Sequence, residues 1–410
     1  MSSAVQTAPL QTSDRLHGLD ALRGGALLLG VVLHAAMSFF PTQIWIVGDT
    51  QTSAGASGLF FAIHLFRMTA FFLIAGLFAH MMMGRRGVVG FIKDRAIRIA
   101  GPLVAFWPFL LAAFVAVLIW SAVIANGGTL PTNSPPPPLT VSNFPLTHLW
   151  FLWVLLIFYV AMLILRAPFA LLDRQGGWGA GVDRLVGAAI GPWTPALMAA
   201  PLALAFWATP TWIPFFGIPT PDTGLVPNTV ALTGFGAAFG LGFLLDRRRD
   251  LLGRIAGLWA VFSVMAVVAG VGALMLVGGA TPVLAPVADL GLKTATAAVM
   301  ALAVYSTTFA VLALTLRFAS GHSAGHRYLA DASYWIYIVH LPLVMVGQVL
   351  AARIDAPWWI KLAGIVAATV AIALVSYELL IRHSFMGRWL NGRRIPWRRA
   401  PVASVLTPAE

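Results

Sequence analysis

Residues 17–34 read HGLDALRGGALLLGVVLH, an apolar stretch interrupted by an aspartate, an arginine and a final histidine. With the apolar residues that follow, it is long enough to cross the ~30 Å hydrocarbon layer of a membrane as a helix. An ionisable group at that depth costs roughly 2.5–3.5 kcal/mol on insertion scales, so its default interpretation is a functional site. Arg23 and His34 are eleven residues apart, which is about 16 Å and three helical turns, so both side chains lie on one face.

The whole chain has the composition of a polytopic membrane protein. Of its 410 residues, 59% are hydrophobic and 10% are charged, and the mean hydropathy is +0.86. A soluble fold could not bury that much apolar surface. The chain has no cysteine, which excludes disulfides, a thiolate nucleophile and a Cys-ligated metal. We expect no metal and no bound cofactor.

Runs of about 20 apolar residues predict an all-α protein with about ten transmembrane helices, and an even number places both termini on one side. We expect a polar N-terminal tail at 1–18 without the features of a cleaved signal peptide, a membrane domain at 19–381 and a basic tail at 382–410. The expected helices cover 19–40, 58–81, 102–125, 148–171, 194–212, 227–245, 254–279, 293–316, 333–351 and 358–381. The fifth is crowded with proline.

Positive charge predicts that both termini are cytoplasmic. With that orientation, all but four of the 26 Lys and Arg residues lie in cytoplasmic segments, as the positive-inside rule requires. The four exceptions are Arg67, Lys293, Arg353 and Lys361. The net charge of +12 is therefore a topology signal, and no nucleic-acid partner is expected, because the basic residues are spread over six separate segments. We expect a multi-pass protein of the inner (plasma) membrane.

Four of the nine histidines are expected in the half of the membrane away from the cytoplasm: His34, His64, His148 and His340. Neutral histidine can take or give a proton near pH 7, so a cluster at similar depth indicates a site. The alternative for each is a histidine that hydrogen-bonds a neighbouring helix. His34 has the stronger claim because it is aligned with Arg23.

Short motifs of polar and aromatic residues occur along the chain from residue 17 to 394. They are LDALRG at 19–24 with His34 beyond it, HLFRMTAFFLIAG at 64–76, KDRAIRI at 93–99, HLWFL at 148–152, SYWIYIVHLP at 333–342, YE at 377–378 and LNGRR at 390–394. In this order they resemble membrane acyltransferase family 3, in particular the branch that transfers succinyl groups to periplasmic glucans. Thr69 departs from the family pattern, which has proline there.

The resemblance implies a membrane O-acyltransferase. It would move an acyl group, acetyl or succinyl, from cytoplasmic acyl-CoA, its co-substrate, to a hydroxyl of a glycan or glycolipid at the outer face. His34 would act as general base, a role that typically contributes about 10²–10⁴-fold, and Arg23 would lie on the path of the donor. Arg95 and Arg98, one turn apart, would bind the donor phosphates through charge-assisted hydrogen bonds.

The supporting residues each keep a structural alternative. Asp20 and Arg23 could simply neutralise one another as i,i+3 neighbours, and Arg95 and Arg98 could be ordinary cytoplasmic arginines. The remaining candidates are His64 with Arg67, which would hold substrate or stabilise an oxyanion, His148, His340 and Glu378. Arg67 could instead pair with an outer acid such as Asp289, and Glu378 could form a helix-end salt bridge with Arg382.

A second class of function stays open, a transporter or flippase for a small anionic or lipid solute. Intramembrane His, Arg and Glu residues also mark solute and proton paths. The sequence lacks the inverted repeats and paired broken helices of many transporters. Slow release of CoA from acyl-CoA by the purified protein would distinguish an acyltransferase from a transporter.

Overall fold

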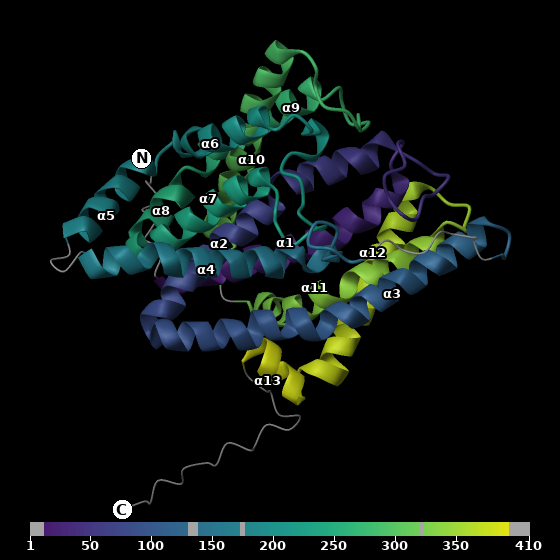
Figure 1. The fold of residues 1–410 in the computed structure, drawn as a ribbon, viewed down its shortest axis with the longest axis horizontal. Helices are drawn as coiled ribbons and strands as arrows, with labels where there is room; N and C mark the ends of the chain where they lie inside the picture. Colours follow the sequence, from purple (N-terminus) through teal and green to yellow (C-terminus); the bar gives the residue numbers. More distant parts are fainter. Residues whose placement is uncertain (1–11, 130–137, 173–176, 320, 322, 393–410) are drawn as a thin grey trace, which may run out of the picture.

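The computed structural model describes residues 12–129, 138–172, 177–319, 321 and 323–392 (Figure 1). Within these ranges the chain is helical, with one isolated β-bridge between Pro145 and Thr223. The all-α fold is therefore confirmed. The α-helices are α1 (Thr12–Ala36), α2 (Ala54–Arg95), α3 (Gly101–Ala125), α4 (Trp150–Leu172), α5 (Gly177–Ala189), α6 (Thr194–Ala208), α7 (Thr229–Leu245), α8 (Asp250–Gly257), α9 (Trp259–Leu276), α10 (Leu290–Phe318), α11 (Ala324–Ala351), α12 (Trp358–Ser376) and α13 (Phe385–Asn391).

Short turns of other helix types join some of these helices. Two are π-helical, η2 (Ala96–Ala100) between α2 and α3 and η6 (Tyr377–Ile381) after α12. The others are 3-10 turns: η1 (Met37–Phe39), η3 (Thr147–Leu149), η4 (Pro214–Phe216) and η5 (Asp246–Arg248).

Eight helical stretches in the described residues are long and apolar enough to cross a membrane, or nine if one bent pair forms a single span. One of the eight is the 72-residue stretch Ala54–Ala125, whose length would exceed 100 Å if it were straight, about three hydrocarbon layers. Gly87, inside α2, breaks it with non-helical angles (φ 69°, ψ 175°), and the π-helical turn η2 joins the end of α2 to α3. This stretch therefore contains both the second and the third expected spans, and the total of ten stays a prediction.

The fifth expected span differs from the prediction. Only α6 lies in the expected range 194–212, and it meets α5, the helix before it, at an angle of 99°. The second of these, α6, has only 15 residues. It ends because Thr209, which precedes Pro210, is extended (φ −96°, ψ 108°), the conformation that a following proline favours.

The first helix is the centre of the bundle. It packs against α2 on one side and against α11, α12 and α10 on others, so that helices from the two ends of the sequence are neighbours. Many apolar side chains of the outer helices are exposed, among them Val264, Val267 and Met275 of α9. In a membrane protein such faces contact lipid tails, since the bilayer interior is as apolar as they are.

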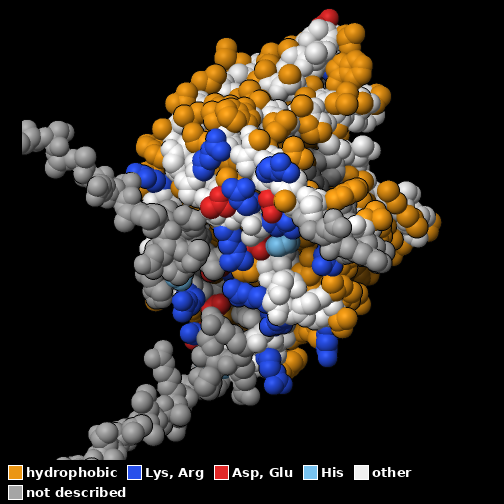
Figure 2. All heavy atoms as spheres, turned by 90° about the vertical axis from the view of Figure 1, so that its left-hand side faces the viewer, with side chains coloured by type: hydrophobic (Ala, Val, Ile, Leu, Met, Phe, Trp, Pro, Cys, Tyr) orange, Lys and Arg blue, Asp and Glu red, His pale blue; other side chains and the backbone are white. Residues whose placement is uncertain are grey.

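Basic side chains gather at the end of the molecule where α2 turns into α3 and α7 into α8, which we call the basic end. Figure 2 looks onto this end and shows Lys and Arg side chains in its centre with apolar side chains around them. Several are held by ion pairs, such as Arg247 with Asp183 at 2.6 Å and Arg249 with Asp246 at 2.6 Å. All these segments were expected in the cytoplasm, and the sidedness itself stays a prediction.

Candidate active site

A cavity of about 320 Å³ lies among α1, α2, α4, α11 and α13. Its lining combines Arg95 and Arg98 of the basic end with a histidine cluster and with aromatic residues of α4 and α11. Of the expected site residues, the cavity brings together Arg23, His34, Arg67, Arg95, Arg98, His148 and His340. It does not include Asp20, His64 or Glu378.

Three histidine rings from three different segments form the cluster. His340 of α11 lies in the middle, with its ring centroid 5.4 Å from His34 and 5.3 Å from His148. His148 Nε2 donates to the Ile338 carbonyl at 3.0 Å, and His340 Nδ1 donates to the Tyr337 carbonyl at 2.7 Å. A carbonyl only accepts, so these nitrogens carry the protons and the other nitrogen of each neutral ring is a lone-pair acceptor.

Those remaining nitrogens, His148 Nδ1 and His340 Nε2, are buried and have no hydrogen-bond partner among the described residues, and the same holds for His34 Nδ1. Buried polar atoms are normally paired, so such exceptions need an explanation. The cluster can accept hydrogen bonds or a proton from a group that enters the cavity.

The end of α1 at His34 is held by a side chain that the sequence did not single out. Gln348 of α11 is 1% exposed, and its Nε2 donates to the His34 carbonyl at 2.8 Å and to the Ala35 carbonyl at 3.3 Å. These carbonyls lie in the last turn of the helix, where no backbone partner is available. Trp45 Nε1 donates to Gln348 Oε1 at 2.9 Å, and the Trp45 ring lies 6.0 Å from the His34 ring. The only amide side chain in the helix at 333–351 was a signal that could have pointed to Gln348.

The segment that carries Trp45 is anchored by a buried ion pair. Lys361 Nζ contacts both carboxylate oxygens of Asp49 at 2.9 Å, and each side chain is 2% exposed. This explains one exception to the charge rule, since Lys361 neutralises an acid inside the protein. The pair fixes residues 40–53 against α12, next to the histidine cluster.

Arg67 reaches from α2 to α1, one turn before His34. A Cβ atom built on Gly30 would lie 2.1 Å from Nη1 of Arg67, so the guanidinium occupies the space that the glycine leaves. Nε of Arg67 is buried without a partner, and no carboxylate within the described ranges pairs with this side chain. The alternative partner, Asp289, instead caps α10 by accepting from the Leu292 N–H. Arg67 is a half-buried cation with a buried Nε, and it can stabilise negative charge in the cavity.

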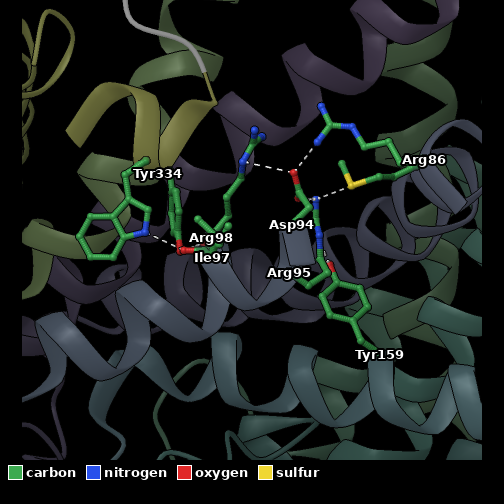
Figure 3. Close-up of polar contacts among 9 residues, drawn as sticks. Arg86, Asp94, Arg95, Ile97, Arg98, Tyr159 and Tyr334 are labelled. Atoms are coloured by element: carbon green, nitrogen blue, oxygen red, sulfur yellow. Dashed lines mark hydrogen bonds and ion pairs between the residues drawn. The ribbon is translucent and has the colours of Figure 1, made fainter. Parts of the chain in front are cut away.

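Asp94 contacts three arginine side chains near the basic end (Figure 3). This carboxylate is 6% exposed and accepts from Arg86 at 2.9 Å and Arg95 at 2.7 Å, and it pairs with Arg98 Nε at 3.3 Å. Arg95 also lies over the rings of Phe91 and Tyr159. One negative charge among three guanidinium groups leaves an excess of positive charge. The sequence motif contained Asp94, but its role was not predicted.

Arg98 sits in a π-helical turn, a feature that occurs frequently at functional sites. The hydroxyl of Tyr334 donates to its carbonyl at 2.6 Å. Arg23 has the contact that was its structural alternative, since its Nη2 lies 3.3 Å from Asp20 Oδ1. The same nitrogen donates to the Ala330 carbonyl at 3.2 Å, which the sequence did not predict, and the side chain lines the cavity. Pairing with Asp20 therefore does not remove Arg23 from the site.

His64 and Glu378 have other surroundings. His64 stacks on Phe60 at 5.0 Å, its Nε2 lies 3.2 Å from the Ile218 carbonyl, and its side chain does not line the cavity. Glu378 accepts from Arg382 at 2.7 Å, and the bonds to this carboxylate raise the pKa of the Arg382 guanidinium. His64 therefore contacts a backbone carbonyl, and Glu378 forms the expected salt bridge with Arg382.

Comparison with known proteins identifies the family of the chain. A family model for an acyltransferase domain matches residues 16–378. Relatives named Glucans biosynthesis protein C, from Salmonella paratyphi B (strain ATCC BAA-1250 / SPB7), Salmonella heidelberg (strain SL476) and Salmonella agona (strain SL483), are 30% identical over 146 residues, which is 35% of this chain and 37% of each relative. The match thus spans little more than a third of these curated relatives, and no solved structure matches. Because the family model covers nearly the whole membrane domain, the chain belongs to acyltransferase family 3.

Proposed function

We propose that this protein is an acyl-CoA-dependent O-acyltransferase of the inner membrane. It moves an acetyl or succinyl group from cytoplasmic acyl-CoA to a hydroxyl of a glycan or glycolipid at the outer face. The observation that carries the proposal is a single cavity lined both by the arginines around Asp94 and by the histidine cluster. A long thioester bound by its phosphates at the first group can extend its reactive carbonyl toward the second.

His34 is the general base in this proposal. It takes the proton of the acceptor hydroxyl as the oxygen attacks the thioester carbonyl carbon. The carbon–sulfur bond then breaks, and the proton passes from His34 to the CoA thiolate, so that the ester and free CoA leave the site. The neighbouring lone pair of His340 can share the proton that His34 holds between the two steps.

Arg67 has the position of an electrostatic stabiliser. Attack on the thioester develops negative charge on the carbonyl oxygen, and a preorganised donor in a dry site stabilises this charge. Arg67 is half-buried, reaches α1 one turn from His34, and has a buried Nε without a partner among the residues described. Removing one donor of this kind costs about 10²–10³-fold in turnover.

The proposed donor site consists of Arg95 and Arg98. Hydrogen bonds to a charged group contribute about 1.5–3 kcal/mol, so Arg98→Ala should weaken acyl-CoA binding by roughly tenfold or more. A short acyl thioester without the nucleotide should be affected much less. Equal losses for both donors would indicate damage to the fold instead of a lost phosphate contact.

The deciding experiment is CoA release by the purified protein in nanodiscs, followed with a thiol reagent. The chain has no cysteine to react with the reagent. His34→Ala should abolish release and transfer, whereas His64→Ala, a histidine outside the cavity, should retain both. A protein that never releases CoA, or a His34→Ala variant with substantial turnover, would contradict the proposal and favour the transporter. Mass spectrometry of envelope glycans from cells with and without the gene then identifies the acceptor.

A further inference from the structure

A second cavity, of about 340 Å³, adjoins the first at the basic end of the molecule. Arg98 lines both cavities, so it marks the point where they meet. Four basic side chains line the second cavity, Arg86, Lys93, Arg98 and Arg388, together with a single acid, Asp94. We call this space the basic cleft.

The charge of the basic cleft is not balanced by its own residues. Asp94 already contacts Arg86, Arg98 and, from the first cavity, Arg95. Lys93 and Arg388 are exposed, and in the described part of the chain neither forms an ion pair. Cations gathered around one occupied carboxylate attract an anion, and Arg and Lys are the residues that bind phosphate.

The short helix α13 forms the wall between the two cavities. Leu390 and Asn391 line the first cavity, whereas Arg388 and Gly392 line the basic cleft. Three side-chain hydrogen bonds dock this wall. Trp389 Nε1 donates to the Ile97 carbonyl at 2.7 Å, and Asn391 Nδ2 donates to the Asp331 carbonyl at 2.9 Å and to the Tyr377 hydroxyl at 3.2 Å. These hydrogen bonds fix α13 in place next to Arg98.

Gly392 brings this wall close to Arg98. Its φ of 76° is left-handed, and a Cβ atom there would lie 2.0 Å from Nη2 of Arg98. Only glycine both adopts this conformation at little cost and leaves room for the guanidinium. The backbone thus holds the Arg98 side chain at the junction of the two cavities.

We propose that the basic cleft binds a phosphate monoester, the 3′-phosphate on the ribose of the CoA donor. This inference rests on the proposed function and extends it from the thioester to the other end of the same molecule. Arg98 at the junction then faces the diphosphate in the middle of the donor, while Lys93 and Arg388 bind the 3′-phosphate beyond it. An anionic lipid headgroup offers the same phosphate chemistry, so the test must separate the two sources.

The test compares the binding of CoA and of 3′-dephospho-CoA to the full-length protein in nanodiscs of zwitterionic lipid, by calorimetry. The wild type should bind CoA at least tenfold more tightly than 3′-dephospho-CoA, because charge-assisted bonds to the 3′-phosphate are present only with CoA. The double variant Lys93→Gln and Arg388→Gln should lose this preference while its affinity for 3′-dephospho-CoA is unchanged. Arg85→Gln, an exposed arginine of the same segment that lines neither cavity, should keep the preference.

Two outcomes overturn the inference. One is a wild type that binds CoA and 3′-dephospho-CoA equally. The other is a double variant that keeps the preference for CoA but loses retention of phosphatidylglycerol in nanodiscs that contain it, which would make the basic cleft a lipid site. Transfer from a short acyl thioester separates this failure from failure of the proposed function. If that transfer continues and depends on His34, the acyltransferase proposal stands without the 3′-phosphate site, and the same reaction shows that the double variant is folded.

Discussion

Replacing Gly30 with alanine tests whether Arg67 acts on the reacting thioester. The new methyl group would lie 2.1 Å from Nη1 of Arg67, whereas ordinary van der Waals contact begins near 3.4 Å. The guanidinium must therefore withdraw by roughly 1 Å. Because the obstructing atom is the end of a flexible side chain, the helices need not move. A misplacement of this size can cost about 10²-fold in rate, which is the loss that we expect for Gly30→Ala.

Stability should change in the opposite direction from activity. Alanine is a better helix former than glycine by up to about 1 kcal/mol in a helix interior, so Gly30→Ala should unfold at an equal or higher temperature. Gly25→Ala is the matched control, because a Cβ on Gly25 of the same helix has no atom within 4 Å. CoA release and thermal unfolding are measured on the same samples.

A double variant shows whether Gly30→Ala works through Arg67. If it does, adding Gly30→Ala to Arg67→Ala should cause no further loss, because residues that act through one contact are not additive. Full activity of Gly30→Ala would refute the role of Arg67. So would equal losses for Gly25→Ala and Gly30→Ala.

Three further results are expected. Gln348→Leu should lower both turnover and thermal stability, because it leaves buried carbonyls at the end of α1 and the indole N–H of Trp45 unpaired, at about 1–3 kcal/mol for each group; a variant with unchanged unfolding would contradict the contacts described. Lys361→Met should destabilise the protein by about 3–5 kcal/mol, since it leaves the Asp49 carboxylate buried without its cation, and adding Asp49→Leu should recover part of the loss. A cysteine at Gln51 should react with a membrane-impermeant thiol reagent from outside the cell and one at Arg85 should not; the reverse pattern would invert the topology and place the acceptor in the cytoplasm.

The sequence predicted the spans better than the site, because hydropathy is a property of each segment alone. It was wrong about the length of the fifth span, because α6 ends before Pro210, whereas the second and third expected spans both lie in the long stretch that Gly87 interrupts. Most of the expected N-terminal tail, residues 1–11, and Arg393 and Arg394 of the LNGRR motif lie outside the described residues, so the structure adds nothing on them.

Which polar residues meet depends on how the helices are rotated against one another, and no local pattern contains that information. His64 and Arg67 are i,i+3 neighbours, yet only Arg67 enters the cavity, because the side chain of His64 is held by the carbonyl of Ile218. The exceptions to the charge rule were a better signal. Both Arg67 and Lys361 lack a topological reason for their positions: Lys361 forms a buried ion pair with Asp49, and Arg67 lines the cavity.

The cavity is built from the beginning and the end of the chain, and this has a consequence for biosynthesis. Residues 23 and 34 leave the ribosome about 300 residues before His340 and Asn391, which complete the lining. At about 5–20 residues per second, that interval lasts on the order of tens of seconds. During this time the nascent protein has the proposed base, His34, and the four arginines that line the cavity, but not the helices that complete it. Under the proposed function, an unfinished or truncated chain lacks part of the cavity, and we expect it not to hydrolyse acyl-CoA before the last helices have been inserted.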